Sequence, residues 1–365
     1  MDIKNTTLPA SSSVAEVDFV EGCKIIDKIY ASSPALYRPS KFWERFNDLN
    51  MHQLIEKGYG RFKQTANTNY FQFMVEGVRN RYLTFFLPDY PKRELFRTLL
   101  LSRTADCPLK LVGRLVYRTY VVMLYGYVQT LDRLHLIDRV HEPEEGTPVK
   151  VFYEGKMLSQ DILNSAQEFY ALDEVTHISD RDSLIVGEIG AGYGRIGFLL
   201  ANVFASKRFK YCIFDVPPAL CVSQHYLSRV FPKAKTLTIR DFKSFSEIEK
   251  EFNEAQFCFF LPHQIELLPP KIFDLFISVS NLPEMTKTQV DNYFVHIDRL
   301  CRGYFYNKQF WIHMNPHDGY TMRFLDYPAP SHWSLLLLRP VRGKVDFFEA
   351  VYQIPNKKAH NTAHA

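Results

Sequence analysis

One stretch, residues 183–198, constrains the fold more than any other part of the chain. It begins with a short apolar run, Leu-Ile-Val at residues 184–186, which is typical of a buried strand. It ends in an amphipathic helical pattern from Arg195 onward. Between the two, glycine recurs at every second position, at Gly190, Gly192 and Gly194. Because glycine lets the backbone turn sharply and approach a ligand closely, this pattern predicts the first unit of a doubly wound α/β sheet.

The spacing of the glycines indicates which class of ligand the loop binds. From Glu188 the loop reads E-x-G-x-G-x-G, whereas the dinucleotide fingerprint is G-x-G-x-x-G. This spacing favours S-adenosylmethionine over a cofactor that contains a pyrophosphate. A glycine loop by itself is equally well explained as a tight turn, so the prediction depends on the strands that follow.

Further apolar runs predict more strands of the same sheet, and polar side chains follow most of them. These strands are expected over residues 211–215, 256–261, 273–280, 304–308 and 347–354. Ligands of such sheets bind outside the carboxyl ends of the strands. The polar residues expected at those ends are Glu188, Asp215, His263, Asn281 and Glu284.

Asp215 ends the second predicted strand, where an acid accepts hydrogen bonds from ribose hydroxyls in nucleotide-binding folds. The alternative is a carboxylate that caps the helix beginning near Pro217. Together with the glycine loop, ribose binding is the favoured interpretation, and the end of the next strand is expected to contact the adenine ring. The predicted cofactor contacts are Glu188, Gly190, Ala191, Gly192, Tyr193, Gly194, Asp215, Val216, His263, Gln264 and Asn281.

Composition indicates a soluble globular protein. The chain has 365 residues, of which 46% are hydrophobic and 23% charged, and its net charge of +4 favours neither a nucleic-acid surface nor a polybasic membrane anchor. Its 6 cysteines are scattered without a C-x-x-C pair, which favours a reducing cytoplasm. The longest nearly uncharged helical stretch, residues 119–131, is shorter than the roughly 20 residues that span a bilayer.

The chain is expected to divide into a mostly helical region, 1–180, an α/β domain, 181–355, and a disordered tail, 356–365. Residues 1–15 are also rich in Ser, Thr and Asn, and we expect them to be disordered. Whether the helical region covers the active site or forms the contact of a homodimer stays open at this point.

Within the helical region, Ser40 is a plausible N-cap of the second helix. The polar segment 62–70 is either a solvated loop or a loop that faces a hydroxylated substrate. Helices are predicted over residues 17–31, 41–58, 93–105, 110–138 and 159–172, and in the α/β domain over 241–252 and 286–300.

Residues 188–308 resemble class I S-adenosylmethionine-dependent methyltransferases. Residues 188–194 are similar to the first motif of that superfamily, and Ile213-Phe-Asp215 to its second. More narrowly, the chain resembles a sugar O-methyltransferase family of bacterial polysaccharide loci in residues 40–43, 142–148, 159–165, 261–264, 281–285 and 327–333. The resemblance implies S-adenosylmethionine as cofactor and a sugar hydroxyl, on a nucleotide sugar or a surface-glycan precursor, as acceptor. The alternatives are a methyltransferase with a non-sugar acceptor and an inactive binding protein of the same fold.

Methyl transfer to a hydroxyl needs a base near the cofactor's methyl group. The candidates are Glu284, which follows the fourth strand, and His313 and His317, because histidine titrates near neutral pH. Glu284 is equally well explained as an acid in the first turn of a helix. Lys308 is expected to be solvated rather than to hold an anionic group. No metal is predicted, since a site would require distant residues to assemble: Asp215, His263, Glu284, His313, His317 and Asp318.

Overall fold

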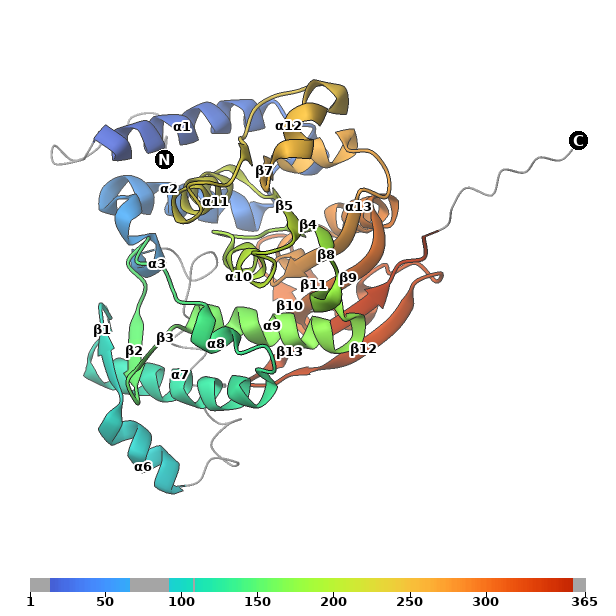
Figure 1. Ribbon diagram of the computed structural model, residues 1–365. Helices are drawn as coiled ribbons and strands as arrows, with labels where there is room; N and C mark the ends of the chain where they lie inside the picture. Colours follow the sequence, from blue (N-terminus) through green and yellow to red (C-terminus); the bar gives the residue numbers. More distant parts are fainter. Residues whose placement is uncertain (1–13, 66–91, 108, 357–365) are drawn as a thin grey trace, which may run out of the picture.

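The computed structural model of the chain describes residues 14–65, 92–107 and 109–356 (Figure 1). The predicted disordered ends lie outside these residues, apart from their margins, as do residues 66–70 of the polar segment 62–70. Residues 62–65 of that segment are helical and bury Phe62 and Lys63, so the prediction of a loop is wrong there. Within the described part, a large mixed sheet runs through the middle of the molecule. Its strands, in spatial order, are β12 (Ser334–Val341), β13 (Lys344–Gln353), β9 (Cys301–Phe310), β8 (Phe273–Val279), β4 (Ser183–Ile189), β5 (Arg208–Phe214), β7 (Phe257–Phe260) and β6 (Thr236–Leu237).

The strand order confirms the predicted doubly wound, Rossmann-like fold. Strands β4, β5, β7, β8 and β9 are parallel. Leaving out the short edge strand β6, they lie in the order third, second, first, fourth, fifth along the chain, which is the nucleotide-binding order. The order reverses between β4 and β8, so the crevice at their carboxyl ends is where such a sheet binds ligands. Strand β13 runs antiparallel to β9, and β12 runs antiparallel to β13 and forms that edge of the sheet.

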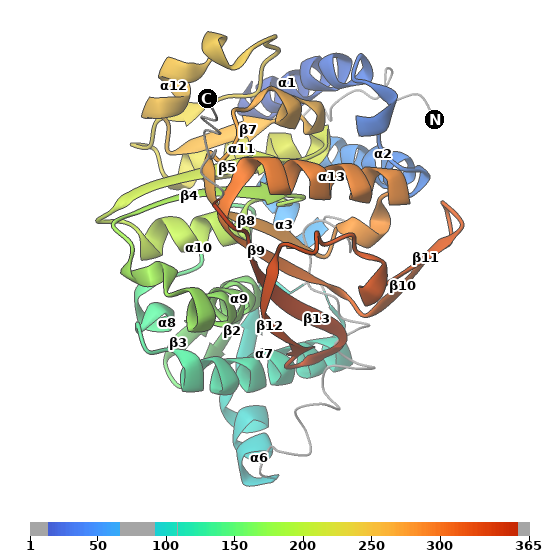
Figure 2. The same cartoon turned by 90° about the vertical axis from the view of Figure 1, so that its right-hand side faces the viewer.

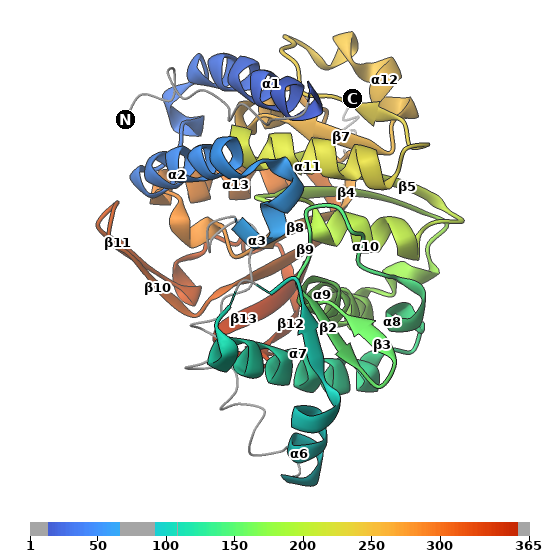
Figure 3. The same cartoon turned by 90° about the vertical axis from the view of Figure 1, so that its left-hand side faces the viewer.

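Helices cover both faces of the sheet (Figures 2 and 3). Helices α10 (Arg195–Val203) and α11 (Pro217–Val230) pack on one face, and α12 (Glu249–Glu254) and α13 (Lys287–Leu300) on the other. Alternate residues of β5 enter different cores: Tyr211 and Ile213 join the first, Cys212 and Phe214 the second. Because both faces are buried, the parallel strands read as continuous apolar runs, which is why most of them were predictable.

The helices of the first 180 residues share the core of the sheet. Helix α1 (Val14–Ala31) packs on α11, α2 (Lys41–Lys57) lies beside it, and α9 (Gln160–Thr176) packs on α10 and on α7 (Leu111–Leu131) (Figure 3). The remaining elements there are α3 (Phe62–Thr65), α6 (Lys92–Leu101), α8 (Leu136–Arg139) and a small sheet of β1 (Arg103–Ala105), β2 (Lys150–Tyr153) and β3 (Lys156–Leu158). A hairpin of β10 (Ile312–Asn315) and β11 (Tyr320–Arg323) projects from the sheet domain (Figure 2).

Several predicted boundaries differ from the structure for local reasons. The predicted helix 110–138 is two helices, because the Asp132 carboxylate accepts hydrogen bonds from the backbone N–H groups of Leu136 and Ile137 and so begins α8. The predicted helix 241–252 is helical mainly over α12, and the predicted helix 93–105 ends at Leu101, before strand β1. Strands β1, β3, β6, β10, β11 and β12 were not predicted. Ser40 is the N-cap of α2, as predicted, since its Oγ accepts from the backbone N–H of Trp43 at 3.3 Å.

Two helical glycines offer a test of this packing. A Cβ on Gly197 in α10 would lie 2.8 Å from the ring of Tyr211, whereas a Cβ on Gly126 in α7 would meet nothing within 4 Å. We expect Gly197→Ala to lower the free energy of unfolding by about 1–3 kcal/mol through overpacking. The matched control Gly126→Ala should raise it by about 0.5–1 kcal/mol, because alanine is the better helix former. Urea unfolding measures both; shifts of the same sign would contradict the close contact at Gly197.

Candidate active site

A cavity opens at the carboxyl ends of β4, β5, β8 and β9, at the reversal point of the sheet. The space between its walls, with the open mouth and the solvent in it included, is about 1430 Å³. The walls come from the glycine loop, the strand ends, α9 and the segment between α1 and α2.

The glycine loop forms the floor of this cavity. Gly190, Gly192 and Gly194 have φ values of 67°, 61° and 87°, a region that other residues rarely adopt. The backbone N–H of Gly190 donates to the carbonyl of Phe214 at 2.9 Å. A Cβ on Gly190 would lie 2.0 Å from Nδ2 of Asn281. The loop is thus a cradle that only glycine fits at its first position.

Asn281 lines the cavity, but its side chain supports the loop. Its Nδ2 donates to the carbonyl of Ile189, and its Oδ1 accepts from Ser278 Oγ at 2.6 Å. Its backbone N–H donates to Gln309 Oε1 at 3.0 Å. With the amide engaged on both sides, Asn281 fixes the end of β4 against β8 and offers a ligand little beyond its backbone.

Asp215 lies at the end of β5 with its carboxylate facing the cavity. Its two oxygens accept from the backbone N–H groups of Gly192 at 2.9 Å and Val216 at 2.8 Å. Burial raises the pKa of Asp215 to about 7, against the lowering effect of these two hydrogen bonds. The acid therefore holds the glycine loop against the end of β5. It does not cap the next helix, since the N-cap of α11 is Val216 and has no side-chain hydrogen bond.

Glu188 also lines the cavity and is only 2% exposed. Its carboxyl accepts a hydrogen bond from the hydroxyl of Tyr211. Burial raises the pKa of Glu188 to about 8, although the Tyr211 hydrogen bond and the charge of Arg195 act in the opposite direction. Two acids of raised pKa thus flank the glycine loop, and a bound cation would stabilise their charged forms.

The segment of residues 33–42, which we call the strap, closes one side of the cavity. Its residues Arg38, Pro39 and Ser40 line the cavity. Hydrogen bonds fix the strap to the carboxyl edge of the sheet at several points: Ser33 to His263 Nδ1 (2.8 Å), Tyr37 to Glu266 (2.7 Å), Leu36 and Arg38 to Gln289 (3.1 and 2.7 Å), Ser40 to the carbonyl of Glu284 (2.7 Å) and the backbone of Lys41 and Phe42 to Asp318 (3.2 and 3.3 Å). The helical region therefore contributes directly to the site.

The structure does not bring all of the predicted cofactor contacts to the cavity. His263 binds the strap, and Gln264 is fully buried, with its amide bonded to the backbone of Leu261 (2.9 Å) and Arg240 (2.7 Å). Gly194 serves as the N-cap of α10. The predicted contacts that do line the cavity are Glu188, Gly190, Ala191, Gly192, Tyr193, Asp215, Val216 and Asn281.

None of the three predicted base candidates lines the cavity wall. Glu284 is 6% exposed, and its Oε2 has no hydrogen-bond partner in the described part of the chain. Burial, reinforced by the charge of Asp215, raises the pKa of Glu284 well above its usual value. His313 packs on the ring of Phe310, and His317 packs on that of Phe42, both in the region of the projecting hairpin.

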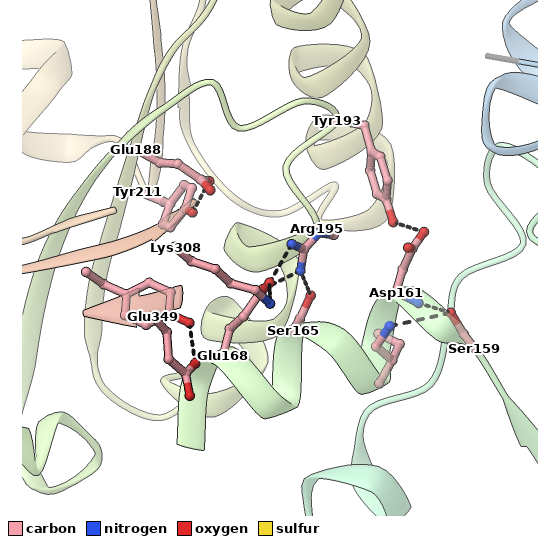
Figure 4. A network of polar contacts seen from close by, with 12 residues as sticks. Ser159, Asp161, Ser165, Glu168, Glu188, Tyr193, Arg195, Tyr211, Lys308 and Glu349 are labelled. Carbon is pink, nitrogen blue, oxygen red and sulfur yellow. Dashed lines mark hydrogen bonds and ion pairs between the residues drawn. The ribbon is translucent and has the colours of Figure 1, made fainter. Parts of the chain in front are cut away.

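A buried ion network joins the helical region to the sheet (Figure 4). The Glu168 carboxylate of α9 receives both Arg195, from the start of α10, and Lys308 Nζ, at 2.7 Å from β9. Burial alone would raise the pKa of Glu168, but the two cations outweigh it and lower the pKa to about 2. Lys308 is 1% exposed in its side chain, so the expectation that it is solvated is wrong.

Polar residues of α9 that are not among the predicted site residues also face the cavity. Gln160 and Asn164 line it, and Oε1 of the first and Oδ1 of the second are buried without a hydrogen-bond partner in the described residues. Asp161 accepts from the hydroxyl of Tyr193 at 2.7 Å. Two signals in the sequence pointed to them: the run of polar residues at the start of an otherwise buried helix, and the resemblance of residues 159–165 to the sugar O-methyltransferase family.

Residues 14–65, 92–107 and 109–356 contain no group of three His, Cys, Asp or Glu side chains placed to hold a metal ion. The six residues considered for a metal site from the sequence are therefore not assembled into one in this part of the chain. No helix among the described residues is long and apolar enough to cross a membrane.

Comparison with known proteins gives matches only among solved structures; no family model matches the chain, and no curated protein matches it significantly. Magnesium protoporphyrin IX methyltransferase from Synechocystis PCC 6803 with bound SAM is similar at 10% identity over 78% of this chain and 98% of that chain, with a TM-score of 0.37. The 1,6-didemethyltoxoflavin-N1-methyltransferase of Burkholderia thailandensis is similar at 14% identity over 70% of this chain and 95% of that chain, with a TM-score of 0.36. The [4+2]-cyclase SpnF is similar at 12% identity over 54% of this chain and 82% of that chain, with a TM-score of 0.36. Likenesses this weak carry no argument about chemistry, so the proposals below rest on the site itself.

The raised pKa of Glu188 predicts how stability depends on pH. In the folded protein this acid keeps its proton up to about pH 8, whereas in the unfolded chain it loses the proton near pH 4.5. Its contribution to the free energy of unfolding is therefore lost as the pH rises from about 4.5 through about 8. Glu188→Gln imitates the protonated acid. We expect little difference from the wild type at about pH 5 and a variant more stable by about 2–4 kcal/mol at about pH 8.

Urea unfolding at a series of pH values measures this difference. Glu249→Gln, at an exposed position of α12, is the matched control and should follow the wild-type profile. A Glu188→Gln profile parallel to that of the wild type would contradict a neutral, buried Glu188.

Proposed function

We propose that the protein is a class I S-adenosylmethionine-dependent methyltransferase. The observation that carries this proposal is the pairing of the glycine cradle with two buried acids, Glu188 and Asp215, at the reversal point of the sheet. A pyrophosphate would meet two carboxyls here, which is unfavourable. S-adenosylmethionine carries a sulfonium and an ammonium group, and these cations would favour the ionised acids.

The chain's own residues fit this cofactor. Gly190 to Tyr193 let the backbone approach it, and a side chain at Gly190 would collide with Asn281. Asp215 accepts hydrogen bonds from ribose hydroxyls, and Glu188 faces the cationic methionine end. When bound, the cofactor supplies an electrophilic methyl group for in-line displacement. The protein aligns the acceptor with that methyl group, which is worth several kcal/mol of the barrier.

We further propose a sugar hydroxyl as the acceptor. The supporting observation is the polar wall that α9 presents, in which Oε1 of Gln160 and Oδ1 of Asn164 are buried and unpartnered. An unpaired buried polar atom costs about 1–3 kcal/mol, and the hydroxyls of a sugar would satisfy both atoms. The resemblance of residues 159–165 to the sugar O-methyltransferase family agrees with this role.

Substitution of Asp215 tests the cofactor assignment. We expect Asp215→Ala to weaken S-adenosylmethionine binding about 10- to 100-fold, because hydrogen bonds from ribose hydroxyls to a charged group are lost. Calorimetry measures the affinity, and Asp241→Ala, an exposed acid outside the cavity, should bind like the wild type. Unchanged affinity in Asp215→Ala, or a wild type that prefers NAD to S-adenosylmethionine, would contradict the assignment.

Glu284 is the proposed general base. It is buried with no hydrogen-bond partner at Oε2 among the described residues, and it lies between the cavity-lining residues Asn281 and Met285 in the chain. Burial raises its pKa, and the positive charge of the bound cofactor would favour the ionised form that a base requires. Catalytic hydrogen bonds often form only when substrate binds. Glu284→Gln is expected to lower kcat about 10²- to 10⁴-fold with unchanged cofactor affinity. His313→Ala and His317→Ala should each change kcat less than about tenfold, because His313 packs on the ring of Phe310 and His317 on that of Phe42, in the region of the projecting hairpin.

The assay for these variants is release of S-adenosylhomocysteine in the presence of a panel of nucleotide sugars. A large loss of kcat in either histidine variant, together with an active Glu284→Gln variant, would assign the general base to the hairpin instead. Release of S-adenosylhomocysteine with aromatic alcohols but not with sugars would contradict the sugar acceptor and favour an aromatic one. No release with any acceptor would favour an inactive binding protein of this fold.

A further inference from the structure

We propose that the acceptor carries an anionic group, a carboxylate or a phosphate, and that this anion pairs with Lys344. The inference deepens the proposed function and rests on it. It would make the substrate an acidic sugar, such as a hexuronate or a sugar phosphate, rather than a neutral one.

Lys344 lies in the half of the cavity away from the predicted ribose contact. It is the first residue of β13, and it lines the cavity together with Phe347 and Lys308. Since Phe347 is paired with Phe310 at the end of β9, this part of β13 lies at the carboxyl edge of the parallel strands. The order β5-β4-β8-β9-β13 places Asp215 on one side of the glycine loop and Lys344 on the other. The lysine therefore belongs to the acceptor side of the cavity.

Positive charge exceeds negative charge on this side. Arg195 and Lys308 share the single carboxylate of Glu168, which leaves one net positive charge before Lys344 is added. The ammonium group of Lys344 has no ion-pair partner in the described part of the chain. It lies 5.8 Å from the centroid of the Phe347 ring. Asp161, which also faces it, is hydrogen-bonded to Tyr193, and burial raises its pKa. An anionic ligand would complete this arrangement.

The charged and titratable groups around Lys344 are Lys308 from β9, Arg195 from α10, and Glu168 and Asp161 from α9. Burial, reinforced by repulsion from Lys308, lowers the pKa of Lys344 to about 7. The free protein thus loses part of this charge at neutral pH, and a bound anion would restore it. Binding of a carboxylate ligand should accordingly weaken as the pH rises above about 7.

The neighbouring amides indicate what the anion is attached to. Gln160 and Asn164 line the same cavity and each keeps a buried, unpartnered oxygen, which requires a hydrogen-bond donor such as a hydroxyl. A ligand with hydroxyls and one anionic group satisfies both the amides and Lys344. A carboxylate of the cofactor's own methionine is the competing source of an anion.

The test is a titration of the protein saturated with S-adenosylhomocysteine, by calorimetry, with glucuronate, glucose 6-phosphate and glucose. At least one anionic probe should bind the wild type about 10- to 100-fold more tightly than glucose, the range for a hydrogen bond to a charged group. Lys344→Met should remove that preference and leave glucose binding unchanged. The matched control Lys250→Met, at an exposed position of α12, should behave as the wild type.

The stronger of the two anionic probes identifies the carboxylate or the phosphate as the bound group. Glucuronate affinity should fall between about pH 6 and pH 8.5 in the wild type and stay level in Lys344→Met. Equal binding of anionic and neutral probes, or no binding of either, overturns the proposal. A loss of about tenfold or more in S-adenosylmethionine affinity in Lys344→Met also overturns it, because the lysine then holds the cofactor's carboxylate. Failure of the wild type to bind S-adenosylhomocysteine contradicts the proposed function instead.

Discussion

The shared carboxylate of Glu168 is the interaction on which the architecture of the site depends. It is buried, and it holds a cation from α10 and a cation from β9 at once. Removing it would leave two uncompensated charges in the interior, which is far costlier than losing a surface ion pair. The network therefore fixes α9 in one position over the carboxyl edge of the sheet. That position brings Gln160 and Asn164 into the cavity beside the glycine loop.

The sheet and the network divide the cavity into halves of opposite electrostatic character. Near β4 and β5 the wall offers carboxyls of raised pKa, which suit a cationic ligand. Beyond β8 it offers Lys308, which is paired with Glu168, and Lys344, which has no ion-pair partner among the described residues. A cationic methyl donor and an anionic acceptor would each find the complementary half. The methyl group would then lie near the boundary between the two halves, where the transfer must take place.

The core of the site was predictable from the sequence because it follows local rules. The glycine spacing, the apolar strands and Asp215 at a strand end depend on residues that are close in the chain. His263 and Asp318 could not be assigned in this way, since their partners are on the strap, more than two hundred residues earlier in the chain. Lys308 was misjudged for the same reason: only the tertiary contact with Glu168 shows that its charge is buried. The sequence indicated these polar residues as candidates for the site, but it could not indicate which residues they bond to in the fold.

The strap has a mechanical consequence for the site. The parallel strands lie between two apolar cores, so exposing them requires breaking much of the hydrophobic packing. The strap buries Tyr37 and Phe42, but several of its other residues are held by individual hydrogen bonds, each of which is exchanged for a hydrogen bond to water at small net free energy. The free energy of local opening is thus lower for this wall of the cavity than for the strands that form its floor. Amide hydrogens of the strap should exchange through local opening, before those of β4 and β8, so this wall can move to admit a larger ligand while the floor of the cavity stays folded.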